Sequence, residues 1–278
     1  MPGRAKPARD RVPAVPQTGE DRIAAAFALR RGAAALMPYL MGGFPDMATS
    51  RAIGEAYAAN GADLIELGVP YSDPLADGPV IHEAGTAALK AGATIGGVLE
   101  VAEALARRVP VMLMAYVNLI LARGPEAFAQ AARDAGISGL IIPDLPFEEA
   151  PEIEAACREH AIALVPLVAP TTTDERLAMI GAKARGFIYT VSVTGTTGER
   201  TTGEDDFRPI LDRVRAHTTV PVALGFGIAT PEQAAAAARA GADGVIVGTR
   251  LVRAAAEAED PAAATGELVA ALAAGLIR

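Results

Sequence analysis

The sequence has little of several residues on which protein chemistry often depends: one cysteine, three histidines and three lysines among 278 residues. The single cysteine, Cys157, permits no internal disulfide bond. Long apolar runs are also missing, because the longest candidate, at 268–277, contains Gly275 and is shorter than the roughly 18 residues that a membrane span needs. We therefore expect a protein of the cytoplasm that does not span a membrane.

Positive charge is in short supply. The chain has 25 Lys and Arg against 33 Asp and Glu, which gives a net charge of -8. Such a chain repels phosphodiester backbones, and this argues against nucleic acid as a partner. Four basic residues and four prolines gather in residues 1–16, without the apolar core of a signal peptide. We predict a flexible leader over residues 1–20 and one folded domain over 21–278.

Hydrophobic residues are plentiful, at 51% of the chain, and they recur in short runs separated by longer alanine-rich segments with charges at helical spacing. The starts of these runs advance from residue 36 to residue 244 in steps of roughly 30 residues, the length of one β-α unit. Eight such runs predict parallel strands, at 36–41, 63–69, 109–116, 139–142, 163–168, 186–191, 220–224 and 244–247.

Three helix ends share one pattern, in which a glycine and a short polar residue precede a buried run. They are at 60–63, 135–138 and 240–243. Strands that are apolar throughout are covered on both faces, and eight repeated units favour a closed (β/α)8 TIM barrel with outer helices. An open, doubly wound sheet is the alternative, since periodicity alone does not separate the two.

The barrel prediction directs the search for chemistry to the carboxyl ends of the strands. Glu66 lies inside an apolar strand, on the same side as Leu64 and Gly68, and Asp77 follows in a loop stiffened by prolines. Burial would raise the pKa of Glu66 toward a value useful for acid and base catalysis. The alternatives are a buried structural glutamate, paired with backbone or an arginine, and a turn role for Asp77.

Glycines follow the last three predicted strands, and they include Gly198, Gly227 and Gly248. Loops after strands seven and eight of this fold commonly bind phosphate through backbone N–H groups, so we predict a phosphate site here. The polar loop at 194–206 is either a lid that closes over a ligand or a surface loop.

Missing residues narrow the reaction class. The lysines, Lys6, Lys90 and Lys183, are not at predicted strand ends, which argues against a Schiff-base aldolase. The three histidines lie on or near predicted helices and are not spaced as metal ligands are; they are His82, His160 and His217. This argues against a zinc aldolase. Cys157 fits a structural thiol in a helix. We expect carboxylate acid and base chemistry, with no metal, on a small phosphorylated molecule.

The segment ELGVPYSDPLADGP at 66–79 resembles the signature of the tryptophan synthase alpha subunit family. The resemblance extends over the chain from about Asp21, through PYLMGGFP at 38–45, YVN at 116–118, PDLP at 143–146, Tyr189, VTGTTG at 193–198, GFGI at 225–228 and GT at 248–249. It implies a lyase that cleaves indole-3-glycerol phosphate to indole and glyceraldehyde 3-phosphate by a retro-aldol reaction, without a cofactor in this subunit.

The resemblance also implies roles for individual residues. Glu66 would be the general acid and base, and Asp77 would accept the indole N–H and stabilise the positive charge on the ring. Substrate would be bound by the other matching residues, namely Tyr39, Tyr189, Thr197, Gly198, Gly227, Gly248 and Thr249, with threonine at 249 where serine is commoner in the family.

The same resemblance implies a partner, a beta subunit that carries pyridoxal phosphate, in an αββα heterotetramer. The docking face would include Pro70, Asp73 and Asn118. The alternatives are a stand-alone indole-3-glycerol-phosphate lyase, a catalytically silent regulatory barrel, or another phosphate-binding barrel such as an isomerase or a decarboxylating cyclase. Against the cyclase stands the missing strand-end lysine, and against the silent barrel stands the joint presence of Glu66, Asp77 and Tyr189.

Overall fold

The computed structural model describes residues 18–30, 33–191, 204–225 and 227–276. Residues 1–17 of the predicted leader, and the loop residues Thr197 and Gly198, lie outside the described residues. The first helix, α1 (Gly19–Leu29), begins two residues before residue 21, where we placed the start of the domain. A capping box begins it, because the Asp21 N–H donates to the Thr18 hydroxyl (3.1 Å) and the Thr18 N–H donates to the Asp21 carboxylate (3.2 Å).

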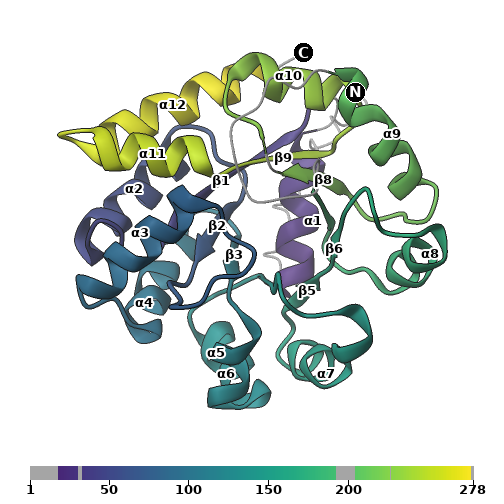
Figure 1. The fold of residues 1–278 in the computed structure, drawn as a ribbon, viewed down its shortest axis with the longest axis horizontal. Coiled ribbons are helices and arrows are strands. Elements are labelled where there is room, and N and C mark those ends of the chain that lie inside the picture. Colours follow the sequence, from purple (N-terminus) through teal and green to yellow (C-terminus); the bar gives the residue numbers. More distant parts are fainter. Residues whose placement is uncertain (1–17, 31–32, 192–203, 226, 277–278) are drawn as a thin grey trace, which may run out of the picture.

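Parallel strands form a barrel at the centre of the molecule (Figure 1). Their order around the barrel is β5-β4-β3-β2-β1-β9-β8-β7-β6, and every pair is parallel. Within the described residues they are β1 (Ala35–Met41), β2 (Ile65–Gly68), β3 (Val111–Met114), β4 (Gly139–Ile141), β5 (Ala163–Val165), β6 (Leu167–Val168), β7 (Ile188–Val191), β8 (Val222–Gly225) and β9 (Gly244–Val247).

The two ends of this order are successive parts of one segment, which brings the sheet round on itself. β5 pairs with β4, whereas β6 pairs with β7, and only Pro166 separates β5 from β6. Proline has no N–H, so a strand is interrupted where it stands. The predicted run at 163–168 is therefore two short strands, each of the other seven runs contains one strand, and the barrel is confirmed over the open sheet.

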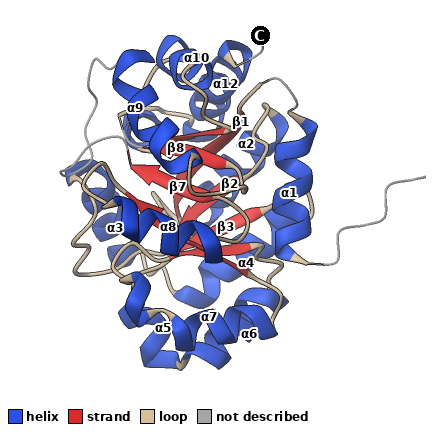
Figure 2. Cartoon of the chain, turned by 90° about the vertical axis from the view of Figure 1, so that its right-hand side faces the viewer, coloured by secondary structure: helices blue, strands red, loops and turns tan. Residues whose placement is uncertain are grey.

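Helices surround the strands on all sides (Figure 2). None in the described part of the chain is long and apolar enough to cross a membrane. After α1 they are α2 (Met47–Ala59), α3 (Pro79–Lys90), α4 (Ile95–Ala106), α5 (Val117–Arg123), α6 (Pro125–Asp134), the short 3-10 helix η1 (Phe147–Glu149), α7 (Pro151–Glu159), α8 (Asp174–Lys183), α9 (Glu204–Arg215), α10 (Pro231–Arg239), α11 (Thr249–Glu257) and α12 (Pro261–Gly275).

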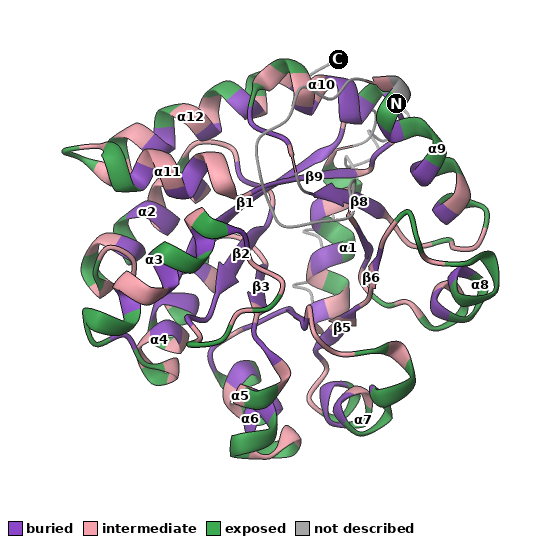
Figure 3. Cartoon of the chain, in the orientation of Figure 1, coloured by how far each residue is buried: buried purple, intermediate pink, exposed green. Residues whose placement is uncertain are grey.

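Alternate strand residues pack into two main cores, one between strands and helices and one inside the barrel, and a smaller third cluster packs Tyr39 and Met41 of β1 against α3. In β2, Ile65 and Leu67 belong to the outer core with the helices, whereas Leu64, just before the strand, belongs to the inner core with Met112 and Ile141. Both cores are buried, and the exposed residues lie on the helices and loops around them (Figure 3). This alternation decides which strand residues face the inside of the barrel.

The three predicted glycine turns are present. Gly61, Gly136 and Gly241 have φ of +106°, +76° and +108°, in the left-handed region where glycine is favoured. At each turn an arginine donates to the glycine carbonyl oxygen. The three pairs are Arg30 with Gly61, Arg22 with Gly136, and Arg215 with Gly241.

Two of these turns carry a further bond that ties neighbouring strands together. The Asp63 carboxylate accepts from the N–H of Leu36 (2.8 Å), and the Asp243 carboxylate accepts from the N–H of Val222 (2.9 Å). At the third turn the equivalent residue is Ser138, whose buried hydroxyl has no hydrogen-bond partner among the described residues. The side-chain bond to the neighbouring strand is therefore present at two of the three turns and missing at the third.

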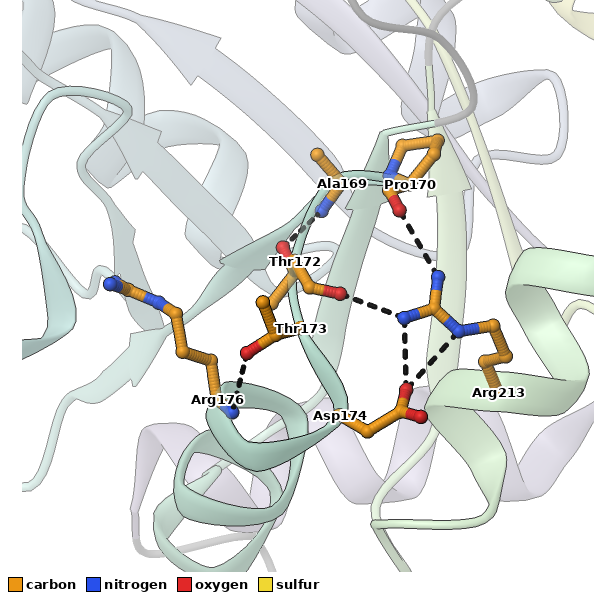
Figure 4. Close-up of polar contacts among 7 residues, drawn as sticks. All are labelled: Ala169, Pro170, Thr172, Thr173, Asp174, Arg176 and Arg213. Carbon is orange, nitrogen blue, oxygen red and sulfur yellow. Dashed lines mark hydrogen bonds and ion pairs between the residues drawn. The ribbon is translucent and has the colours of Figure 1, made fainter.

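The loop between β6 and α8 is held by an arginine from α9 (Figure 4). The Arg213 guanidinium donates to the carbonyl oxygens of Pro170 (3.1 Å) and Thr172 (2.8 Å), and it pairs with the Asp174 carboxylate (2.9 Å). The Thr172 hydroxyl accepts from the N–H of Ala169 and closes the turn. One side chain thus fixes the end of β6 against the helix that precedes β8.

Candidate active site

Glu66 lies on the inward-facing side of β2. Its neighbours in the register are Tyr39 on β1 and Met112 on β3, and Met112 belongs to the core inside the barrel. The residues before and after it, Ile65 and Leu67, face the helices instead. Only 1% of Glu66 is exposed, so the carboxyl group is enclosed by the barrel, on the side that the alternation in the sequence predicts.

Burial, and to a smaller extent the negative charge of Asp77, raises the pKa of Glu66 to about 8. No salt bridge to Glu66 is formed by the described residues, which separates it from a structural glutamate neutralised by an arginine. With a pKa near 8 the carboxyl group is protonated at neutral pH, and a proton donor is therefore present inside the barrel.

Asp77 is half-buried in the loop between β2 and α3. Burial raises its pKa and the Tyr116 hydroxyl and the charge of His82 lower it in part, so that the resulting pKa is about 6. Asp77 is consequently ionised at neutral pH while Glu66 is protonated. Two carboxyl groups whose pKa values differ in this way can act as acid and as charge partner in one reaction.

Tyr39 and Tyr189 face the same space from β1 and β7. The pKa of each phenol is raised well above its ordinary value, first by burial and then by the charges of Glu66 and Asp77. Since both tyrosines respond to both carboxyl groups, the four side chains are close together. In the sheet order, β9 and β8 lie between β1, which carries Tyr39, and β7, which carries Tyr189. The four side chains therefore reach across the barrel interior.

Two glycines make room for these aromatic rings. A Cβ at Gly68 would lie 2.1 Å from the Tyr39 hydroxyl oxygen, and a Cβ at Gly225 would lie 2.6 Å from a Tyr189 ring carbon. Both distances are shorter than side chains allow. The absence of a side chain at the ends of β2 and β8 is thus required by the two aromatic rings.

The predicted phosphate residues follow β8 and β9. Gly227 has φ of +81°, and Gly248 is the N-cap of α11, whose first residue is Thr249. The start of a helix presents unpaired backbone N–H groups and a positive partial charge, which suits a phosphate. Gly248 also lies near Tyr39, since a Cβ there would be 3.6 Å from the Tyr39 Cβ. The position of Thr197 and Gly198 in this site stays a prediction.

Sequence reasoning missed the role of Tyr116, which follows β3. Its hydroxyl accepts from the Ala76 N–H (3.0 Å) and its ring stacks on Tyr71, with centroids 5.2 Å apart. The Tyr71 hydroxyl in turn accepts from the side-chain amide of Asn118 (3.0 Å). The signal available in the sequence was the place of Tyr116 at the carboxyl end of a predicted strand.

Apart from His82 on α3, whose charge acts on Asp77, the lysines and histidines described next lie away from this group. Lys90 and Lys183 are the last residues of α3 and α8, and His160 pairs with Glu126 on the outer surface. Cys157 is buried in α7, where burial raises the pKa of its thiol to about 12. In the described residues, no three or more His, Cys, Asp and Glu side chains gather where they could hold a metal ion.

Comparison with known proteins shows the family to which the chain belongs. A sequence model of the family described as the tryptophan synthase alpha chain matches residues 26–275. The chain belongs to the tryptophan synthase alpha chain family. The match includes both carboxyl groups, both tyrosines and the glycines after β8 and β9, and membership makes this chain a lyase that carries out the alpha reaction of tryptophan biosynthesis.

Individual relatives are similar over nearly their whole length. The tryptophan synthase alpha chain of Acidiphilium cryptum is 48% identical, over 83% of this chain and 85% of the relative. That of Gloeobacter violaceus is 48% identical, over 84% and 86%. Among solved structures, tryptophan synthase of Mycobacterium tuberculosis matches with a TM-score of 0.86 and 40% identity, covering 92% of this chain and 98% of the other.

Proposed function

We propose that Glu66 and Asp77 cleave indole-3-glycerol phosphate to indole and glyceraldehyde 3-phosphate. The observation that carries this proposal is a buried carboxyl group with a pKa of about 8 beside a carboxyl group with a pKa of about 6. A protonated acid and an ionised carboxylate in one enclosed space are what a retro-aldol cleavage of an indole requires.

Glu66 supplies the proton. Indole is a poor carbanion leaving group, so C3 of the ring is protonated before the carbon–carbon bond breaks. The Glu66 carboxyl group donates this proton and becomes a carboxylate. It then accepts the proton of the glycerol hydroxyl on the carbon attached to C3. As the carbon–carbon bond to C3 breaks, its electrons return to the ring, which leaves as indole. The glycerol phosphate part of the substrate leaves as an aldehyde.

Asp77 stabilises the intermediate. Protonation at C3 places positive charge on the ring nitrogen, and a carboxylate that accepts the N–H offsets that charge. The half-buried position of Asp77 strengthens this interaction, because water screens it less than at an open surface.

Substrate is held by residues around the two carboxyl groups. Tyr39 and Tyr189 line the indole pocket. Backbone groups of Gly227, Gly248 and Thr249 hold the phosphate, and Gly198 and Thr197 complete the site from the loop before α9. Under this proposal the reaction uses no cofactor bound by this chain.

The partner we propose is a tryptophan synthase beta subunit that carries pyridoxal phosphate, in an αββα tetramer in the cytoplasm. The exposed side chains of Asp73 and Asn118 support docking through this face, as does Leu75, which is 86% exposed in the same loop. Pro70 is already buried within the single chain. It would therefore support this face from beneath and would not contact the partner.

The test is indole formation from indole-3-glycerol phosphate by the purified chain, alone and with a beta subunit. We expect Glu66→Gln to bind a non-cleavable indole phosphate as the native protein does and to form no indole. Glu100→Gln, at an exposed glutamate on α4, is the matched control and should keep full activity. Indole formation by Glu66→Gln at the native rate would reject the role of Glu66.

A further inference from the structure

Tyr116 is placed between the end of β3 and the start of α5, where it is the N-cap residue, and it is 2% exposed. Its hydroxyl has two polar neighbours on the loop after β2. The Ala76 N–H donates to it over 3.0 Å, and the neighbouring Asp77 carboxylate is close enough for the hydroxyl to lower its pKa. Because the oxygen accepts from Ala76, the hydroxyl proton is free to be donated to Asp77.

The ring that carries this hydroxyl is held by a stacked neighbour. Tyr71 stacks on it with an interplanar angle of 26°, and the Tyr71 hydroxyl accepts from the side-chain amide of Asn118. Directly after Tyr116, the N–H of Val117 donates to the Asp144 carboxylate (2.9 Å). The hydroxyl therefore has a defined position, set by the end of β3 and the start of α5 together with Tyr71 and Ala76, which lie on the same loop as Asp77.

Asp77 itself has few other restraints. Its backbone N–H donates to the Pro74 carbonyl oxygen (3.3 Å), which orders the turn without fixing the direction of the carboxylate. If one carboxylate oxygen accepts from the Tyr116 hydroxyl, the other is available for a ring N–H. A carboxylate that accepts from one fixed donor is also held in its ionised form.

We propose that Tyr116 is a positioning residue for Asp77: its hydroxyl orients one carboxylate oxygen so that the other meets the indole N–H. This inference rests on the proposed function, because it assigns to Asp77 the ring nitrogen as its partner. Tyr116 acts through Asp77 and takes no proton from the substrate. The stacked pair of Tyr71 and Tyr116 serves to keep that hydroxyl still.

The charged and titratable groups around Asp77 come from several elements, and the test must separate Tyr116 from them. They are Glu66 on β2, Tyr39 on β1, Tyr189 on β7 and His82 on α3, with Asp144 acting on Tyr116. Tyr116→Phe changes none of them. It keeps the stacked ring and removes only the hydroxyl, so any change at Asp77 follows from the lost hydrogen bond.

We expect Tyr116→Phe to lower kcat about tenfold with little change in KM, and to move the acid limb of the kcat profile to higher pH by about one unit. The direction follows because loss of a donor to the carboxylate raises the pKa of Asp77. The preference of the protein for an indole phosphate over its N-methyl analogue should fall by a similar factor. Tyr57→Phe, at a buried tyrosine whose hydroxyl donates to the Tyr39 carbonyl oxygen, should leave the pH midpoint unchanged.

A carbon-13 NMR titration of the Asp77 carboxyl group measures the same shift without turnover. If native protein forms no indole, the proposed function fails, yet this titration still tests the bond to Tyr116. Should Tyr116→Phe not fold, native protein labelled with 3-fluorotyrosine replaces it: the Tyr116 fluorine signal should titrate with Asp77 and stop doing so in Asp77→Asn. An unchanged Asp77 midpoint in Tyr116→Phe, or a Tyr116 signal that ignores Asp77, would overturn the proposal.

Discussion

The hydroxyl oxygen of Tyr39 lies directly over the backbone of Gly68, so close that a Cβ at residue 68 would be only 2.1 Å away. Tyr39 on β1 is also the register partner of Glu66, which lies two residues before Gly68 on β2. The aromatic ring thus fills the space above the acid because the strand ends in a residue without a side chain. The size of residue 68 and the position of the ring are coupled.

We expect Gly68→Ala to displace Tyr39, to lower the free energy of unfolding by about 1 to 3 kcal/mol, as overpacking does, and to reduce indole formation. Gly96→Ala in α4 makes the same change at a helical site where the nearest atom would be 3.9 Å from the Cβ, and should be neutral or slightly stabilising. Urea titration and the indole assay measure both variants. Equal stability of the two variants would contradict the steric argument.

Asp77→Asn should slow indole formation by about 10² or more, because the amide cannot offset the positive charge of the protonated ring. Binding of a non-cleavable indole phosphate should change much less, since that charge exists only during the reaction. Asp134→Asn, at an exposed aspartate on α6, is the control. A native rate in Asp77→Asn would leave this aspartate a turn residue.

Glu66→Gln should stabilise the protein in alkaline solution. The pKa of Glu66 is about 8 in the folded state and 4.5 in its ordinary range, so between these values the folded state holds a proton that the unfolded state has lost. Native stability therefore falls as pH rises through this window, by up to about 1.4 kcal/mol per pH unit for one group. Glutamine does not titrate, so the variant does not lose stability in this way.

The measurement is the free energy of unfolding of both proteins at pH 6.5 and pH 8, above the pKa of about 6 of Asp77. The advantage of Glu66→Gln should grow by about 1 to 2 kcal/mol between the two. Parallel pH profiles for the native protein and the variant would show that Glu66 titrates as an ordinary glutamate.

Thr190→Val should raise the free energy of unfolding by about 1 kcal/mol. Thr190 on β7 is fully buried, and its hydroxyl has no hydrogen-bond partner in the part of the chain that the structure describes, so a valine of the same shape removes an unmet polar group. Thr265→Val is the matched opposite, because that buried hydroxyl donates to the Pro261 carbonyl oxygen (2.7 Å). Thermal unfolding of the pair should give shifts of opposite sign.

Features with a local cause could be predicted from the sequence. Apolar runs bounded by glycine turns predicted the strands, and the alternation around Glu66 predicted that it faces the same side as Leu64, because side-chain direction in a strand depends only on position. Contacts between distant residues could not be predicted. The bond between Ala76 and Tyr116 joins residues 40 apart, and no periodicity contains it. The interruption at Pro166 was visible as a proline, but its effect depends on which neighbour each half of the strand meets.

The junction at Pro166 has one consequence for the motions of the protein. The wall is completed there by short strands: β6 and β7 share two paired positions, as few as any two neighbouring strands, and Pro166 beside them has no N–H to donate to a neighbouring strand. Local opening needs the least free energy where the fewest bonds must break. We expect slow breathing of the barrel to start at this seam, where it would carry Tyr189 with it, while Glu66, three strands away along the sheet, keeps its place.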